Sequence, residues 1–60
     1  MKAADLVQCM ADYGSLTGKA FAEKWPDVMA RQRELARISN APVWDVGARV
    51  FCDIAREVRQ

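Results

Sequence analysis

The sequence of 60 residues contains no histidine, which removes the commonest general base and the commonest metal ligand in proteins. Neither a Ser–His nor a Cys–His nucleophile pair is therefore available. Cys9 and Cys52 are the only cysteines, and two thiolates do not make a zinc site without other soft ligands. We expect a protein that is not an enzyme and that binds neither a metal nor a cofactor.

Long apolar stretches are also absent. No run approaches the roughly 18 residues that a membrane-spanning helix needs. Asp5 and Asp12 interrupt the N-terminal stretch, where a signal peptide would be uniformly apolar. We therefore expect a cytoplasmic protein that does not contact a membrane and whose two cysteines are free thiols.

A strong excess of one charge is missing as well. Nine Lys and Arg residues stand against eight Asp and Glu residues, so the net charge is +1 at pH 7. This value is far from the basic balance of a protein held on nucleic acid by bulk electrostatics. Because 52% of the residues are hydrophobic and 28% are charged, the composition is that of a folded domain rather than a disordered linker.

What the sequence does contain is apolar residues at helical spacing, three and four positions apart. The pattern predicts four helices, over residues 2–13, 17–25, 26–39 and 42–58. Local signals mark their ends: Thr17 as an N-cap, Pro26 and Pro42 in first turns, Gly14 as a C-terminal cap, and Asn40 as a cap at the junction of the last two segments.

Three of these segments have a clear candidate stripe for the core. The first stripe comprises Ala3, Leu6, Val7, Met10 and Tyr13. The third segment offers Val28, Leu35 and Ile38, flanked by Met29 and Ala36. The fourth is the clearest and contains Val43, Val46, Gly47, Val50, Ile54 and Val58.

The predicted fold class is all-α, a compact bundle of three to four short helices in one domain spanning residues 1–60. A chain of this length buries only about 60% of the surface that it exposes when unfolded, so its core is small. Small domains commonly need a further source of stability. We therefore expect self-association to complete the bundle.

Residues 18–36 resemble a helix-turn-helix motif in their first half, where Ala22 takes the place of the small residue of the first helix. The resemblance implies a following recognition helix that offers polar side chains to phosphates and base edges: Arg31, Gln32, Arg33 and Arg37. The sequence departs from the motif at Pro26, which replaces the usual Gly of the turn, and at Asp27 and Gln32, which replace apolar residues. A dimeric DNA-binding transcriptional regulator using residues 18–37 is therefore the alternative function.

The favoured function is a non-catalytic protein-interaction module. Arginine and exposed aromatic residues are enriched in protein interfaces, and the predicted partner-binding residues are Arg31, Arg33, Arg37 and Trp44. Trp44 lies at the edge of its stripe, so we expect it to be half exposed. Such a module would act as a regulator or inhibitor, of phage or plasmid origin, that binds a macromolecular partner and occludes its surface.

Predicted self-association residues lie on the fourth segment: Gly47, Ala48, Phe51 and Cys52. Gly47 weakens a helix, and its presence in the stripe indicates close approach by another helix, from the same chain or from a second copy. Cys52 lies almost opposite the stripe, with Ala48 one turn earlier on the same side. We expect Cys52 to be exposed or to lie in a second interface, and a homodimer is the simplest assembly.

Overall fold

The chain is all-α, as predicted. The computed structural model describes residues 1–59 and contains, within that range, four α-helices and one short 3-10 helix: α1 (Ala3–Ser15), α2 (Gly18–Lys24), α3 (Pro26–Ser39), η1 (Val43–Val46) and α4 (Gly47–Arg59). No helix in the described part of the chain is both long and apolar enough to span a membrane.

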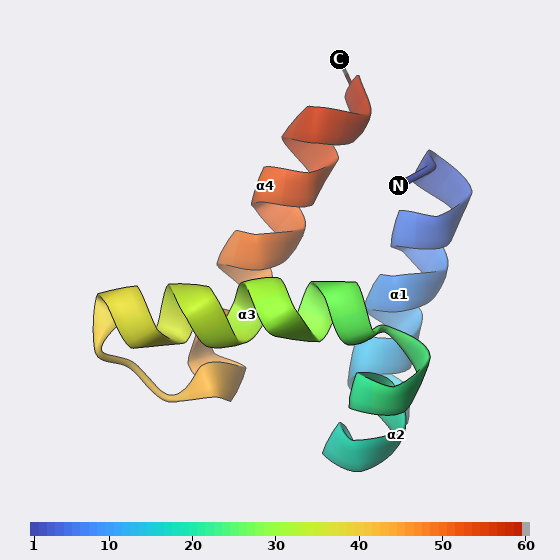
Figure 1. Cartoon of the computed structure of the whole chain (residues 1–60). Coiled ribbons are helices and arrows are strands. Elements are labelled where there is room, and N and C mark those ends of the chain that lie inside the picture. The colour runs from blue at the N-terminus through green and yellow to red at the C-terminus, as the bar shows by residue number, and fades with distance from the viewer. Residues whose placement is uncertain (60) are drawn as a thin grey trace.

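The helices form two layers. In Figure 1, α1 and α4 run in opposite directions behind α3, so that the N-terminus and the end of α4 lie near each other at the top. Near the end of α1, the Tyr13 side chain lies against Gly47, the first residue of α4. α3 crosses in front of α4, and α2 lies against the lower part of α1.

The core fills the space between these layers and draws side chains from all four α-helices: Leu6, Cys9, Phe21, Val28, Met29, Val50, Phe51 and Ile54. Tyr13 joins α1 to the other elements, because its ring makes edge contacts with Phe21 at 5.3 Å and with Phe51 at 5.1 Å between centroids. Offset and edge-to-face pairs of this kind stabilise a core beyond the area they bury.

Three of the predicted helix ends are confirmed. The Thr17 side chain accepts a hydrogen bond from the Ala20 backbone N–H at 3.2 Å, as an N-cap should. Pro26 opens α3, where its missing N–H costs no hydrogen bond. Asn40 closes α3 in the left-handed conformation, with φ of 52°.

Two predicted boundaries are wrong. Gly14 does not terminate the first helix: α1 continues to Ser15, and the Leu16 N–H still donates to the Asp12 carbonyl at 2.8 Å. Pro42 does not open an α-helix either, because it precedes η1, and α4 begins only at Gly47. The predicted fourth helix is therefore divided at Gly47.

The predicted stripe of α1 is also partly wrong. Val7 is 69% exposed and Met10 is 50% exposed, whereas the buried residues of this helix are Leu6, Cys9 and Asp12. The helix thus has two overlapping stripes at helical spacing, one through Val7 and Met10 and one through Leu6 and Cys9, and the second is the one that is buried. Asp12 is bonded to the end of α2, which turns α1 so that Val7 and Met10 face outward.

On α3 the prediction fails at one position, since Ile38 is 66% exposed. The middle of the buried face is instead occupied by Gln32, which is fully buried. The stripe of the last segment is confirmed, because Val46, Val50 and Ile54 are among the best buried side chains and Val43 and Val58 are partly buried against the core.

Gly47 and Phe51 are not available for self-association. Gly47 is buried, and a Cβ placed on it would overlap the Tyr13 hydroxyl and lie 2.6 Å from Tyr13 Cζ. Phe51 is 8% exposed and packs on the same tyrosine. The close approach that Gly47 indicated is therefore made by α1 of the same chain. Of the four predicted self-association residues, only Ala48 and Cys52 are exposed.

Candidate partner-binding surface

A shallow hollow of about 560 Å³ lies between α2, α3 and η1. Its lining combines apolar, cationic and aromatic side chains: Gly18, Lys19, Ala22, Glu23, Met29, Arg33, Val43 and Trp44. Two predicted partner-binding residues, Arg33 and Trp44, meet here although 11 positions separate them in the sequence. We call these eight residues the Arg33–Trp44 surface.

Trp44 is half exposed, as predicted, with 46% of its surface accessible. One part of its ring packs inward against the Tyr13 ring at 5.4 Å between centroids. Another part lies on Gly18, where an added Cβ would come within 2.7 Å of Trp44 Cζ2. The absence of a side chain at Gly18 therefore lets the indole lie close to the start of α2.

A buried hydrogen-bond network fixes the backbone that carries Trp44. The Gln32 side-chain amide donates to the Val43 carbonyl at 2.7 Å and to the Tyr13 hydroxyl at 3.1 Å. The Tyr13 hydroxyl donates in turn to the Trp44 carbonyl at 3.0 Å. These bonds join α1 and α3 to η1 and hold the backbone on either side of Trp44, while the buried Gln32 Oε1 has no hydrogen-bond partner.

Two cations flank the tryptophan without ion pairs. Among residues 1–59, Arg33 and Lys19 form no salt bridge or side-chain hydrogen bond. Both side chains are exposed. Their charges are therefore available to carboxylates of another molecule. The sequence did not single out Lys19, which only the packing of α2 against η1 places beside Trp44.

The other two predicted arginines differ from Arg33. Arg37 lies one turn further along α3 and lines the adjoining hollow with Arg33, but it is bonded to Glu34. This pairing raises the pKa of Arg37 and lowers that of Glu34. Arg31 donates to Glu57 of α4 at 2.7 Å and lines a different hollow. Arg31 is therefore not part of the Arg33–Trp44 surface.

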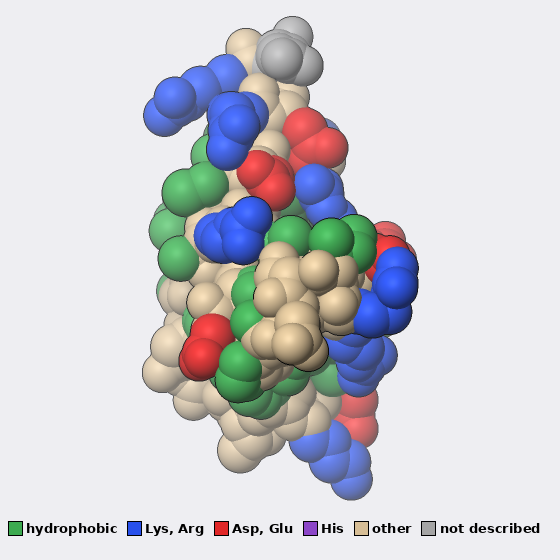
Figure 2. Space-filling model, turned by 90° about the vertical axis from the view of Figure 1, so that its left-hand side faces the viewer, with side chains coloured by type: hydrophobic (Ala, Val, Ile, Leu, Met, Phe, Trp, Pro, Cys, Tyr) green, Lys and Arg blue, Asp and Glu red, His purple; other side chains and the backbone are tan. Residues whose placement is uncertain are grey.

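Lys and Arg side chains gather along the right-hand margin of Figure 2, which is the side of the molecule where α3 lies in Figure 1. Hydrophobic side chains lie along the left-hand margin, and further Lys and Arg side chains project at its upper left. Cationic side chains therefore lie on both sides of this view.

The helix-turn-helix resemblance is not matched by the local geometry. Only Trp25 separates α2 from α3, whereas the motif uses a turn of about three or four residues. Gln32, which the resemblance assigns to phosphates or base edges, is fully buried and bonded within the chain.

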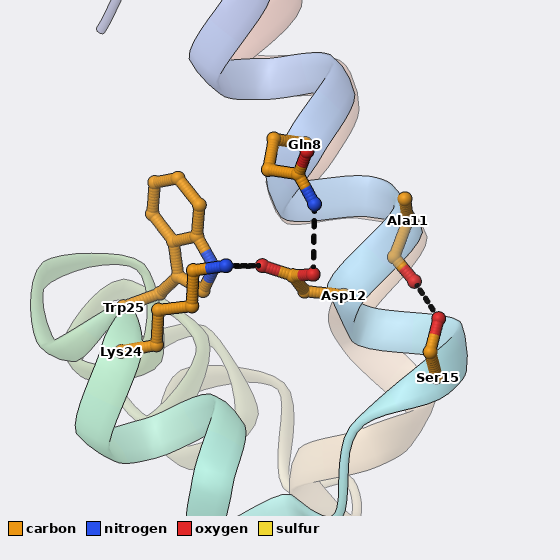
Figure 3. A network of polar contacts seen from close by, with 6 residues as sticks. All are labelled: Gln8, Ala11, Asp12, Ser15, Lys24 and Trp25. Atoms are coloured by element: carbon orange, nitrogen blue, oxygen red, sulfur yellow. Dashed lines mark hydrogen bonds and ion pairs between the residues drawn. The ribbon is translucent and has the colours of Figure 1, made fainter.

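Asp12 is the most highly connected carboxylate of the described residues (Figure 3). It accepts hydrogen bonds from Gln8 and from the Trp25 indole, both at 2.9 Å, and it lies 2.7 Å from the Lys24 ammonium. The hydrogen bond from Lys24, followed by that from Trp25, holds the pKa of Asp12 below its ordinary value. This cluster fixes the junction of α2 and α3 against α1.

The chemistry of the remaining candidate groups is limited. Burial, and then the nearby charge of Asp12, raise the pKa of the Cys9 thiol, so this cysteine is a poor nucleophile. Within the described range, no three Cys, Asp or Glu side chains are grouped as a metal site would require. Comparison of the chain with models of protein families, with curated proteins and with solved structures found no match in any of the three.

Proposed function

We propose that the chain is a cytoplasmic, non-catalytic protein-binding module that docks the Arg33–Trp44 surface onto an acidic, partly apolar patch of a partner protein. The observation that carries the proposal is that Trp44 lines one hollow together with Lys19 and Arg33, two cations without an ion pair among residues 1–59. Tryptophan and arginine are the residues that most often dominate binding energy in protein interfaces.

The partner's chemistry follows from the lining of the hollow. Ala22, Met29 and Val43 offer apolar contact, so a partner side chain that enters the hollow gains from being apolar. Arg33 and Lys19 favour carboxylates around it. Arg33 adds directional selection, because its planar guanidinium binds a carboxylate through two parallel hydrogen bonds.

A nucleic acid fits this surface less well than a protein. The net charge of +1 supplies little of the counterion release that drives binding to DNA. The single-residue junction between α2 and α3 also departs from the helix-turn-helix geometry.

The proposed mechanism is occlusion. Hydrogen bonds from Tyr13 and Gln32 hold the backbone that carries Trp44, and ordering costs on binding are small when a surface is already fixed. A small folded chain seated on an acidic patch blocks that patch to other molecules. We propose that the protein regulates or inhibits its partner in this way.

The test is capture from a lysate of the source cell with the tagged chain, with and without nuclease, and with mass spectrometry as readout. We expect a stoichiometric protein partner that survives nuclease. Trp44→Ala should lower its affinity by a factor of about 30 or more, which corresponds to about 2 kcal/mol. Gly18→Ala should also weaken binding, because the new Cβ pushes the indole aside without removing it.

Arg56→Ala is the control for Arg33→Ala. The Arg56 side chain is 72% exposed, pairs with Asp53 on α4 and is not part of the lining of the hollow. It should leave the affinity unchanged. Recovery of DNA, with associated proteins lost on nuclease treatment, would overturn the proposal in favour of the DNA-binding alternative. Unchanged capture by both Trp44→Ala and Arg33→Ala would remove the Arg33–Trp44 surface from the function.

A further inference from the structure

The first turn of the last helical segment is wound more tightly than the rest. Residues Val43–Val46 form the 3-10 helix η1, and α4 begins at Gly47. The Asp45 N–H donates to the Pro42 carbonyl at 3.0 Å, which is the bond between positions i and i+3 that defines a 3-10 turn. Gly47 itself has ordinary right-handed helical angles, with φ of −57° and ψ of −45°, and the apolar residues of the segment keep helical spacing throughout. The local sequence therefore permits a continuous α-helix from Val43, and the tight turn needs a cause outside it.

Two side chains from other helices supply that cause. The Gln32 amide of α3 donates to the Val43 carbonyl at 2.7 Å, and the Tyr13 hydroxyl of α1 donates to the Trp44 carbonyl at 3.0 Å. In a continuous α-helix both carbonyls would accept instead from backbone N–H groups four residues further along. The side-chain donors thus compete for the acceptors that the wider winding would use, and they hold the turn from outside.

Gln32 supports both of these bonds. Its amide nitrogen also donates to the Tyr13 hydroxyl, at 3.1 Å. The residue is fully buried, and its Oε1 is the one buried side-chain oxygen or nitrogen among residues 1–59 without a hydrogen-bond partner. A buried acceptor without a partner destabilises a fold, whereas an apolar side chain of similar length carries no such cost. Packing alone therefore does not explain an amide at this position.

The winding of η1 sets the direction of Trp44. A 3-10 helix turns about 120° per residue and an α-helix about 100°, a difference of about 20° at each step. Trp44 precedes Gly47 by three positions, so the tighter winding turns its side chain by about 60° around the helix axis. In the direction that results, the indole lies on Gly18 and lines the hollow together with Arg33. Relaxation of η1 to an α-helical turn would carry the ring off Gly18.

We propose that Gln32 is a positioning residue of the Arg33–Trp44 surface, which fixes the 3-10 winding of η1 and through it the direction of Trp44. Its relevance to binding rests on the proposed function, whereas the control of Trp44 by Gln32 is a property of the chain alone. A surface that is already in its binding arrangement loses less entropy on binding. Gln32 thus presents Trp44 to a partner without contacting that partner, since Gln32 has no exposed surface.

The test is 19F NMR of the full chain with 5-fluorotryptophan at both tryptophans, whose resonances are assigned with Trp44→Phe. Gln32→Met removes the amide and keeps a long unbranched side chain in the core. We expect the Trp44 resonance to shift toward its position in the urea-unfolded chain and the Trp25 resonance to stay in place. NOEs within residues 43–48 should change from i to i+2 contacts, which mark a 3-10 turn, to i to i+4 contacts, which mark an α-helical turn.

Tyr13→Phe is the second variant, since it removes only the hydroxyl and leaves the ring in its contacts with Phe21 and Phe51. It should move the Trp44 resonance in the same direction. Ile54→Val is the matched control, because Ile54 is 2% exposed in the core but takes part in none of these hydrogen bonds. This variant should lower the midpoint of urea unfolding and leave the Trp44 resonance unchanged.

An unchanged Trp44 resonance in folded Gln32→Met and Tyr13→Phe would overturn the proposal. So would equal shifts of both tryptophan resonances in these two variants and in Ile54→Val, because Gln32 would then be an ordinary core residue. The proposed function is tested separately: Gln32→Met should weaken binding to the captured partner about tenfold, because Trp44 must then be ordered on binding. Capture of no partner at all would refute the proposed function and leave the control of Trp44 by Gln32 standing.

Discussion

At the scale of single residues, Asp12 shows how one polar contact orients an entire helix. Its carboxylate accepts from Gln8 and Trp25 and pairs with Lys24, while Val7 and Met10 are turned outward. A buried carboxylate that is ionised must be paired and hydrogen-bonded to be tolerated, and Asp12 meets this condition. The orientation of α1 therefore depends on the charge state of this group.

Because the pKa of Asp12 is lowered in the folded state, the stabilisation from its charge is fully present above the ordinary aspartate pKa and is lost as the pH falls through the lowered value. We expect the free energy of unfolding to fall from about pH 5 downward. Asp12→Asn should make this decline shallower and should lower stability at pH 7. Urea unfolding followed by circular dichroism at several pH values measures both effects.

Asp45→Asn is the control for that measurement, because Asp45 forms no ion pair among residues 1–59. The pKa of Glu34 is also lowered, by its ion pair with Arg37. Both side chains of this pair are exposed, and exposed ion pairs contribute little to the free energy of unfolding. An acid-induced loss of stability that is identical in the wild type and in Asp12→Asn would contradict the assigned role.

The two cysteines should differ sharply in reactivity. Cys9 is fully buried and its pKa is raised, whereas Cys52 is exposed. We expect one thiol to react with a disulfide reagent in the native state and two in urea, with Cys9 slower by about 100-fold or more because its reaction requires local opening. Cys52→Ser should abolish the fast reaction and Cys9→Ser should preserve it; fast labelling of Cys52→Ser would show that α1 opens readily.

At the scale of elements, the contact between α1 and α4 depends on the missing side chain at Gly47. Gly47→Ala places a Cβ against the Tyr13 ring, which is itself held by hydrogen bonds to Trp44 and Gln32. We expect Gly47→Ala to destabilise the fold by about 2 kcal/mol or more, since overpacking displaces a rigid neighbour. Thermal and urea unfolding report this change.

Gly14→Ala provides the contrast within α1. No atom lies within 4 Å of the position that its Cβ would take. Alanine favours helix more than glycine does, so this variant should be stabilised by up to about 1 kcal/mol. Equal effects of the two substitutions would mean that helix propensity, rather than contact with Tyr13, explains Gly47.

Three of the element ends were predictable from the sequence because their causes are local. Thr17, Pro26 and Asn40 act through their own backbone and neighbouring N–H groups, so no tertiary information is needed. The orientation of α1 and the burial of Gln32 were not predictable, because each depends on partners far along the chain. A lone glutamine among arginines gives no signal that it will bond to Tyr13 and Val43 across the core.

The candidate surface was predictable in part for the same reason. The position of Trp44 at the edge of an apolar stripe indicated its half exposure correctly. The sequence assigned Arg31, Arg33 and Arg37 to one surface, whereas α3 directs Arg31 toward Glu57 and Arg33 toward the hollow. Lys19 was missed, since its position depends on how α2 meets η1.

At the scale of the whole molecule, the Arg33–Trp44 surface depends on the packing of every helix that carries or supports it. α2, α3 and η1 supply its lining, and the Tyr13 hydroxyl of α1 donates to the Trp44 carbonyl at 3.0 Å. Phe51 of α4 packs on the same tyrosine. Because the unfolding of a small single domain is cooperative, we expect this surface to be lost together with the fold rather than element by element.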